Sequence, residues 1–433
     1  MSMRSIKFNL SSTEASNWEI AVKLTKVYLT QNLKANQLLE SLPTELSNQK
    51  RTACQALFLG ALRHGHRIDH ALQALVKKSP PPQLKAIFLV TGYEILSKKP
   101  EKIPKIIHHA IECSKRFTTK SQTGLLNAVL RKLPDALNSV HPDNRPDVYF
   151  SHPRWLFKRW NKAFGLTNTL KLMQWNQGIP PTYIKLYNPP EITPKGLETT
   201  QWNLFYKVLA EASWREDISP LLNTGSAYVK DPSTRLATEL LMPKCGEKIL
   251  DLCAAPGGKT YDMAHLMELK GHIITVDLPG SRILRLSENL KMLKHPSFQS
   301  TILEEDVLKL TDRVFTSRQL PQQYDAVMLD APCSNTGVIQ RRTDVKWRLK
   351  PDDIKNCSGL QKRLLATASE FVKAGGRLVY STCSIEAEEN QIVVDTFLES
   401  EKGKRFTLKK SSISLPWETM HDGAGAFLLT ANG

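Results

Sequence analysis

The sequence Lys248-Ile249-Leu250-Asp251-Leu252-Cys253-Ala254-Ala255-Pro256-Gly257-Gly258-Lys259-Thr260 joins an apolar run to a Pro-Gly-Gly turn and then to a helical stretch. Glycines let the backbone turn sharply and approach a ligand closely. A helix that begins directly after such a turn offers unpaired backbone N–H groups to that ligand. The stretch therefore predicts a strand, a ligand-binding turn and a helix, which together form the first unit of an α/β sheet.

Strands and helices are predicted to alternate from residue 226 onward. The expected strands are 248–253, 272–278, 301–305, 324–330, 377–382 and 426–429, and the expected helices are 259–269, 281–293, 307–316 and 354–373. This alternation is typical of a mostly parallel sheet with helices on both faces, whose ligands bind beyond the carboxyl ends of the strands. We therefore expect a site where the glycine turn meets Asp277, Asp306, Asp330 and Cys383, which all fall at those ends.

The rest of the chain differs in character from this α/β region. Residues 1–140 carry apolar side chains at helical spacing and no β-rich run, which predicts an all-α domain. Residues 141–225 hold short strand-like runs beside helical stretches, which predicts a small α+β subdomain. The sequence thus predicts three domains, with 226–433 as the third.

The chain is strongly basic, with 59 Lys and Arg against 42 Asp and Glu and a formal net charge of +17 in 433 residues. Such an excess favours a nucleic-acid partner, because Lys and Arg release counterions from a phosphate backbone. Segment 98–133 concentrates the charge, with nine Lys or Arg and two acids. It is either a solvated helical face or a surface that tracks phosphates.

Several classes of protein are disfavoured by simple patterns. No apolar run reaches the about 18 residues of a membrane span, and the N-terminus lacks the apolar segment of a secretion signal. The seven cysteines include no Cys-x-x-Cys pair, which argues against a zinc ribbon and a disulfide framework. A P-loop is excluded because Cys253 stands where its first glycine belongs. We expect a cytoplasmic protein without a metal.

Two cysteines end expected strands, in Asp330-Ala331-Pro332-Cys333-Ser334 and in Tyr380-Ser381-Thr382-Cys383-Ser384-Ile385. Cytosine carbon 5 is too weak a nucleophile to accept a methyl group unaided, and a thiolate that adds to carbon 6 activates it. A thiol has a pKa of about 8.5, so positive charge is needed nearby, and Lys259 is a candidate. On this reasoning either cysteine is the nucleophile, and the other helps proton removal or product release.

The glycine turn fits a methyl-donor cofactor. The helix start after Gly257-Gly258 suits a carboxylate of the kind that S-adenosylmethionine carries. Asp277 lies about 20 residues further on, where an acid typically binds a ribose diol, with Arg282 in support. Asp306 is placed to meet the adenine amino group, and Asp330 to bind the cytosine ring. Taken alone, each of these acids could equally well cap a helix or form a turn instead of binding a ligand.

Basic residues also follow the first cysteine motif directly. The segment Gln340-Arg341-Arg342-Thr343-Asp344-Val345-Lys346-Trp347-Arg348 surrounds a tryptophan with positive charge. This composition favours contact with RNA that flanks the target base. The target nucleotide itself must be unstacked to reach the strand ends.

The motifs resemble those of the Sun/Fmu family of RNA (cytosine-5)-methyltransferases. Residues 251–260 resemble its cofactor motif, 330–334 its Pro-Cys motif and 380–385 its Thr-Cys motif, and Asn390 matches the acidic-Asn tail that follows. Residues 1–140 are similar to the NusB-like RNA-binding domain, through Gly92-Tyr93-Glu94-Ile95-Leu96 and Leu126-Asn127-Ala128-Val129-Leu130-Arg131. The resemblance spans nearly the whole chain.

The resemblance implies a Rossmann-like domain with a mostly parallel, seven-stranded sheet. It implies that S-adenosylmethionine is bound by Cys253, Ala254, Ala255, Pro256, Gly257, Gly258, Lys259, Asp277, Asp306 and Asp330. It further implies that Cys383 attacks the cytosine and that Cys333 assists release. The expected substrate is small-subunit ribosomal RNA, and the expected state is a monomer. The alternatives are the same chemistry on transfer RNA, or a non-catalytic RNA-binding factor of ribosome assembly.

The chain departs from the family pattern at three places. Asn335 stands where the family usually has glycine, and Ala387 stands where proline is common. Lys185-Leu186-Tyr187-Asn188 stands where Arg-Val-Asn is common. None of these changes removes a reacting group, and all lie near loops that shape the fit of the substrate.

Overall fold

The computed structural model describes residues 15–433, which divide into two compact units. The first, here called the helical unit, holds the described residues up to Gly178 together with Ile339–Arg348. The second, here called the sheet unit, holds Ile179–Val338 and Leu349–Gly433. The three-domain division expected from the sequence remains a prediction beside this division into two units.

The helical unit contains only helices and connecting turns within the described residues, as expected for the N-terminal part. Its helices are α1 (Asn17–Thr30), α2 (Ala35–Glu40), α3 (Asn48–Arg63), α4 (Gly65–Leu75), α5 (Pro82–Ser97), α6 (Ile103–Ser114), α7 (Lys120–Asn138), α8 (Pro146–Tyr149), α9 (Arg154–Gln177) and α15 (Val345–Arg348). Helix α1 begins with a capping box, in which the Ser16 hydroxyl accepts from Glu19 N and the Glu19 carboxylate accepts from Ser16 N. Leu24, Phe58 and Phe88 are fully buried in the core between these helices.

A four-stranded antiparallel sheet opens the sheet unit. Its strands, in the order β2-β3-β1-β4, are β1 (Tyr183–Leu186), β2 (Leu197–Thr199), β3 (Phe205–Val208) and β4 (Ala227–Val229), with helix α10 (Ser219–Asn223) beside them. Ile184, Leu186 and Ala227 pack against Ile218 to form a small core.

The main sheet has seven strands in the order β10-β11-β9-β8-β5-β6-β7. They are β5 (Lys248–Leu252), β6 (Gly271–Asp277), β7 (Phe298–Glu304), β8 (Tyr324–Asp330), β9 (Val372–Thr382), β10 (Phe406–Ser414) and β11 (Ala424–Ala431). All neighbouring pairs are parallel except the two that β11 makes, with β9 and with β10. The expected fold, a mostly parallel seven-stranded sheet, is confirmed.

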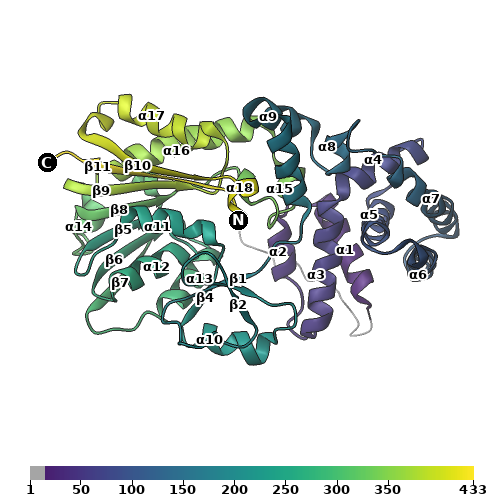
Figure 1. Cartoon of the computed structure of the whole chain (residues 1–433), viewed down its shortest axis with the longest axis horizontal. Helices are drawn as coiled ribbons and strands as arrows, with labels where there is room; N and C mark the ends of the chain where they lie inside the picture. Colours follow the sequence, from purple (N-terminus) through teal and green to yellow (C-terminus); the bar gives the residue numbers. More distant parts are fainter. Residues whose placement is uncertain (1–14) are drawn as a thin grey trace. The chain divides into compact units, whose positions relative to one another are not determined.

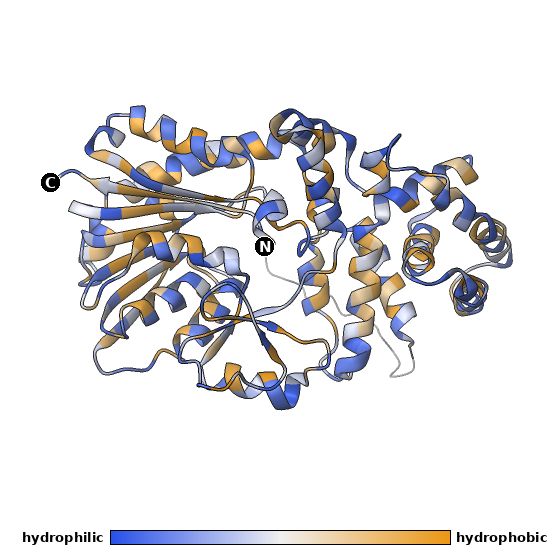
Figure 2. Cartoon of the chain, in the orientation of Figure 1, coloured by the Kyte–Doolittle hydropathy of each residue, from blue (hydrophilic) through white to orange (hydrophobic). Residues whose placement is uncertain are grey.

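Helices cover both faces of this sheet (Figure 1). They are α11 (Arg235–Leu241), α12 (Gly258–Leu266), α13 (Ser281–Leu290), α14 (Asp312–Thr316), α16 (Pro351–Ser369) and α17 (Gln391–Glu399), with the short α18 (Pro416–Thr419) near β10. Side chains along a strand point to alternate faces. Leu250 and Leu252 thus pack toward α14, α16 and α17, whereas Ile249 packs toward α11, α12 and α13. Figure 2 shows the resulting hydrophobic strands between more polar helices.

No described helix is both long enough and apolar enough to span a lipid bilayer.

Candidate active site

The glycine turn follows β5, where the sequence predicts it. Cys253 (φ 59°) and Gly257 (φ 99°) both adopt the left-handed backbone region, and α12 begins at Gly258. A Cβ atom on Gly257 would lie 2.7 Å from Leu286 Cδ1, so this position requires glycine for both its conformation and its space. Burial raises the pKa of the Cys253 thiol, which leaves this residue to contribute its backbone.

Asp277 shapes the turn directly. Its carboxylate accepts hydrogen bonds from Ala255 N (2.8 Å) and Leu278 N (2.9 Å). Arg282 lies 3.7 Å from the same carboxylate and donates to the Ala255 carbonyl. A carboxylate offers about four acceptor sites, so Asp277 can brace the loop and still accept from a ribose hydroxyl. Through these two contacts Arg282 supports both Asp277 and the turn.

Asp306 follows β7 and caps the 3-10 helix Val307–Lys309. Its Oδ1 atom accepts from Leu308 N at 3.0 Å. The capping role that the sequence left open for this acid is therefore realised. Its contact with adenine remains a proposal.

Lys259 and Asp330 form an ion pair, with 2.7 Å between Lys259 Nζ and Asp330 Oδ2. Asp330 also accepts from the Ser381 hydroxyl at 3.0 Å, which ties the ends of β8 and β9 together. Burial lowers the pKa of Lys259, but Asp330 and the nearby Cys383 outweigh it and raise that pKa above its ordinary value. Lys259 is thus a fixed positive charge beside Cys383, as expected.

The structure brings the two cysteines together at the ends of β8 and β9. Cys333 Sγ lies 3.1 Å from Cys383 Sγ, and both side chains are partly exposed. The Cys383 thiol also donates to Asn335 Oδ1 at 3.4 Å, while Asn335 Nδ2 donates to the Cys333 carbonyl at 2.8 Å. The hydrogen bond to Cys383 and burial raise the pKa of Cys333 well above its ordinary value, and the charge of Glu389 adds to the effect.

A buried charge cluster that the sequence analysis missed supports the start of α12. Asp262 Oδ1 lies 3.0 Å from Lys185 Nζ and 2.9 Å from Lys230 Nζ, and it accepts from the Tyr187 hydroxyl at 2.7 Å. Lys230 also donates to the Gly258 carbonyl at 2.6 Å, so the cluster reaches the glycine turn. In the sequence, this cluster is signalled only by residues 185–188, where the chain departs from the family pattern.

Part of the basic segment after the first cysteine motif is used in packing within the helical unit. Ile339–Arg348 belongs to the helical unit, where Lys346 is 1% exposed and donates to the Arg63 carbonyl at 2.8 Å. The Trp347 indole donates to the Leu62 carbonyl at 2.8 Å and fills the space left by Gly65, on which a Cβ would lie 2.0 Å from the indole. The prediction that Lys346 contacts RNA is therefore wrong, because this side chain is used in packing, and contact of RNA with the exposed Arg342 stays a prediction.

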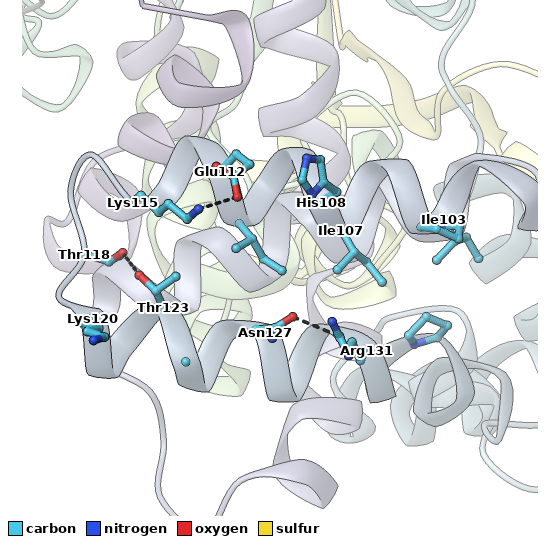
Figure 3. Close-up of a pocket in the computed structure, with 14 residues that line it drawn as sticks. Ile103, Ile107, His108, Glu112, Lys115, Thr118, Lys120, Thr123, Asn127 and Arg131 are labelled. Atoms are coloured by element: carbon cyan, nitrogen blue, oxygen red, sulfur yellow. Dashed lines mark hydrogen bonds and ion pairs between the residues drawn. The ribbon is translucent and has the colours of Figure 1, made fainter.

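The helical unit carries a groove of about 990 Å³ between α6 and α7 (Figure 3). Ile103, Ile107 and Ile111 line one wall along α6. Lys115, Lys120 and Arg131 are exposed at its rim, and they belong to the basic segment 98–133.

Metal ligation has no support in residues 15–433, which contain no group of three or more His, Cys, Asp and Glu side chains suited to it. The glycine turn instead fits S-adenosylmethionine, because the buried carboxylate of Asp277 stands beside it and α12 begins at it. The fold and this turn define an S-adenosylmethionine-dependent methyltransferase.

Comparison with known proteins then identifies the family. Residues 238–416 match the family model "16S rRNA methyltransferase RsmB/F", and residues 17–135 match that of the NusB family. The chain is 31% identical to the ribosomal RNA small subunit methyltransferase B of Proteus mirabilis, over 88% of this chain and 91% of that protein. The chain belongs to this family of RNA methyltransferases.

Two further proteins resemble the chain, one in sequence and one in fold. The probable ribosomal RNA small subunit methyltransferase B of Bacillus subtilis is 29% identical, over 88% of this chain and 87% of that protein. The solved structure of NSun6 from Pyrococcus horikoshii with SFG has a TM-score of 0.54 at 19% identity, and covers 65% of this chain and 98% of that one. The second likeness concerns the fold alone.

Proposed function

We propose that the protein methylates carbon 5 of a cytidine in small-subunit ribosomal RNA, through a covalent bond between Cys383 and cytosine carbon 6. The observation that carries the proposal is the pair of thiols 3.1 Å apart at the ends of neighbouring parallel strands. Lys259 supplies positive charge next to Cys383, which favours the thiolate that attack requires. The raised pKa of Cys333 keeps this residue a thiol, and a thiol does not attack carbon 6.

The Cys383 thiolate gives an electron pair to carbon 6, and the carbon 5–carbon 6 double bond becomes an enamine that is nucleophilic at carbon 5. S-adenosylmethionine supplies the methyl group that carbon 5 takes up. Carbon 5 then loses its proton to a base, the double bond re-forms and the carbon–sulfur bond breaks. Cys333 holds its proton 3.1 Å from Cys383 Sγ, where it can protonate the departing sulfur.

The cofactor is held, in this proposal, by the turn from Cys253 to Lys259 and by three acids. The start of α12 binds its carboxylate, Asp277 its ribose and Asp306 its adenine. Asp330 is held by Lys259 and Ser381, so it faces the same strand ends as the cysteines and is placed to bind the cytosine ring.

The proposed substrate follows from the names of the relatives, which act on small-subunit ribosomal RNA. Sequencing for 5-methylcytidine in RNA from cells with and without the protein tests this choice. A single cytidine of small-subunit ribosomal RNA should lose its methyl group when the protein is absent. A loss confined to transfer RNA would instead support the alternative substrate.

The groove between α6 and α7 is the proposed contact for RNA outside the active site. Its exposed Lys115, Lys120 and Arg131 complement phosphates, which position an RNA without reading its sequence. Lys120→Glu and Arg131→Glu should each weaken binding and lower the slope of log affinity against log salt by about 1. Lys409→Glu, on the exposed edge strand β10, is the matched control. Equal slopes in all three variants would contradict this use of the groove.

A further inference from the structure

We infer that Glu389 is a positioning residue, which sets the placement of the two thiols by holding both cysteine-bearing loops at once. The inference rests on the roles proposed above for Cys383 and Cys333. Glu389 ends the 3-10 helix Ala387–Glu389, which follows the second cysteine motif, and its side chain is fully buried.

The carboxylate of Glu389 accepts hydrogen bonds from both loops. Ser334, the residue after Cys333, donates its backbone N–H to Oε1 at 2.9 Å and its hydroxyl to Oε2. Ser384, the residue after Cys383, donates its hydroxyl to Oε2 at 2.6 Å. Each reacting cysteine is therefore one residue away from an anchor on the same carboxylate.

The surroundings fix the carboxylate itself. Gln361 of α16 donates to Oε1 at 3.1 Å, and the Tyr380 hydroxyl donates to the backbone carbonyl of Glu389 at 2.6 Å. The side chain cannot swing away from the loops without breaking these bonds. The register of β8 and β9 aligns Asp330 with Ser381, but the chain beyond the strand ends needs side chains to hold it.

A carboxylate at this buried position lowers the stability of the fold unless hydrogen-bond donors satisfy its oxygens. Burying an ionised carboxylate costs several kcal/mol, and hydrogen bonds to the charged form offset this cost. Here the donors are the Ser334 and Ser384 hydroxyls, the Ser334 N–H and the Gln361 amide, which satisfy both carboxylate oxygens. An amide or a hydroxyl could fill the space, but neither would accept from every one of these donors.

The charge of Glu389 also separates the two thiols chemically. After the hydrogen bond to Cys383 and burial, it is a further cause of the raised pKa of Cys333. Burial, followed by Glu389, raises the pKa of Cys357 on α16 to about 12, so this neighbour stays a thiol. Burial, followed by Cys333 and then Glu389, raises the pKa of Tyr380 on β9 well above its ordinary value. Glu389 thus adds to the effects that keep Cys333 protonated, while Lys259 favours the thiolate of Cys383.

The test uses Glu389→Gln in the full-length protein, with Glu399→Gln on the exposed end of α17 as control. Glutamine keeps the size but presents an amide NH₂ to one pair of donors. We expect methyl transfer in a single turnover to fall about 100-fold, the size of a roughly 1 Å misplacement, with S-adenosylmethionine affinity unchanged. Alkylation of Cys333 by iodoacetamide, followed by mass spectrometry, should begin at lower pH than in wild type.

The outcomes separate the inference from the function on which it rests. Absence of methyl transfer in the wild type on every RNA would count against the proposed function and not against Glu389 alone. An active wild type with an equally active Glu389→Gln protein and the same alkylation profile would overturn the inference. If Glu389→Gln fails to fold, Ser384→Ala decides, because it keeps the carboxylate and removes the donor that ties the Cys383 loop to it, together with the contacts of that hydroxyl with Ser334 and Thr336. Slow transfer in Ser384→Ala supports the inference, and wild-type transfer overturns it.

Discussion

Asn335 shows how closely single residues control the cysteine pair. Its backbone has φ 63°, a conformation that favours glycine, and its side chain bonds to both cysteine-bearing loops. The family usually has glycine here, so this chain keeps the backbone conformation and adds an amide beside the thiols.

Two substitutions at Asn335 distinguish the effect of its side-chain amide from the effect of its backbone conformation. Asn335→Gly removes the amide without strain, and should slow adduct formation about fivefold, the effect of one hydrogen bond of about 1 kcal/mol. Asn335→Ala should slow it equally and also destabilise the protein by about 1 kcal/mol, because alanine resists a positive φ. Quenched-flow trapping of the adduct and urea unfolding measure the two effects. A Gly variant as fast as wild type would show that the amide does not orient Cys383.

The positions of the candidate site residues at strand ends could be predicted from the sequence, but their contacts with other side chains could not. Cys333, Cys383 and Asp330 sit at strand ends, and a strand end can be located from an apolar run followed by a turn. The contacts of Asp277 with Ala255 N, and of Glu389 with Ser334 and Ser384, depend on side-chain directions in loops. No periodicity encodes those directions, so these partners emerged only from the structure.

At the scale of elements, the buried strands were predicted and the polar edge strand was not. β8 was expected at 324–330 and is found at Tyr324–Asp330, because an apolar run between turn residues marks a central strand. β10 (Phe406–Ser414) was absent from the predicted strands, since it is an edge strand with Lys409 and Lys410 exposed. Polar and lysine-rich residues protect such an edge from aggregation and remove the apolar signal.

The cluster around Asp262 joins the small sheet to α12, and it predicts a large stability effect. Asp262→Asn leaves Lys185 and Lys230 buried without their carboxylate, which should cost about 3–5 kcal/mol in free energy of unfolding. Urea unfolding measures this loss. Glu239→Gln, which breaks a surface ion pair with Arg235 on α11, should cost less than about 1 kcal/mol. Similar losses in both variants would contradict the structural role of the cluster.

At the scale of the whole molecule, each compact unit is made of segments distant in the sequence. Ile339–Arg348 follows the first cysteine motif in the chain but packs within the helical unit. The sequence could not show this, because burial of Lys346 and Trp347 depends on the space above Gly65 and on the carbonyl groups of Leu62 and Arg63. A charged segment with one aromatic residue has the same composition whether it is solvated or packed.

The buried histidines of the helical unit predict an acid-sensitive stability. Burial lowers the pKa of His64 to about 3 and that of His66 to about 4, and lowers the pKa of His152 well below its ordinary value. The unfolded chain takes up these protons below a pH of about 6.5, whereas the folded chain does not. Stability is therefore fully present above that pH, and falls by about 1.4 kcal/mol per pH unit and histidine as pH decreases toward the folded pKa values.

Unfolding by urea between pH 7 and pH 4.5 measures this slope. His66→Gln should make the slope shallower by the share of one histidine, and His295→Gln, an exposed residue of the sheet unit, should leave it unchanged. A slope that His66→Gln does not alter would show that this histidine is protonated in the folded state.

The measurement that tests the central proposal most directly is methyl transfer from labelled S-adenosylmethionine to small-subunit ribosomal RNA, with wild type, Cys383→Ala and Cys333→Ala in parallel. We expect labelled free RNA with wild type only, no covalent complex with Cys383→Ala, and a protein–RNA complex that survives denaturation with Cys333→Ala. A stable complex with Cys383→Ala, or normal methylation by that variant, would contradict the assignment of Cys383 as the nucleophile.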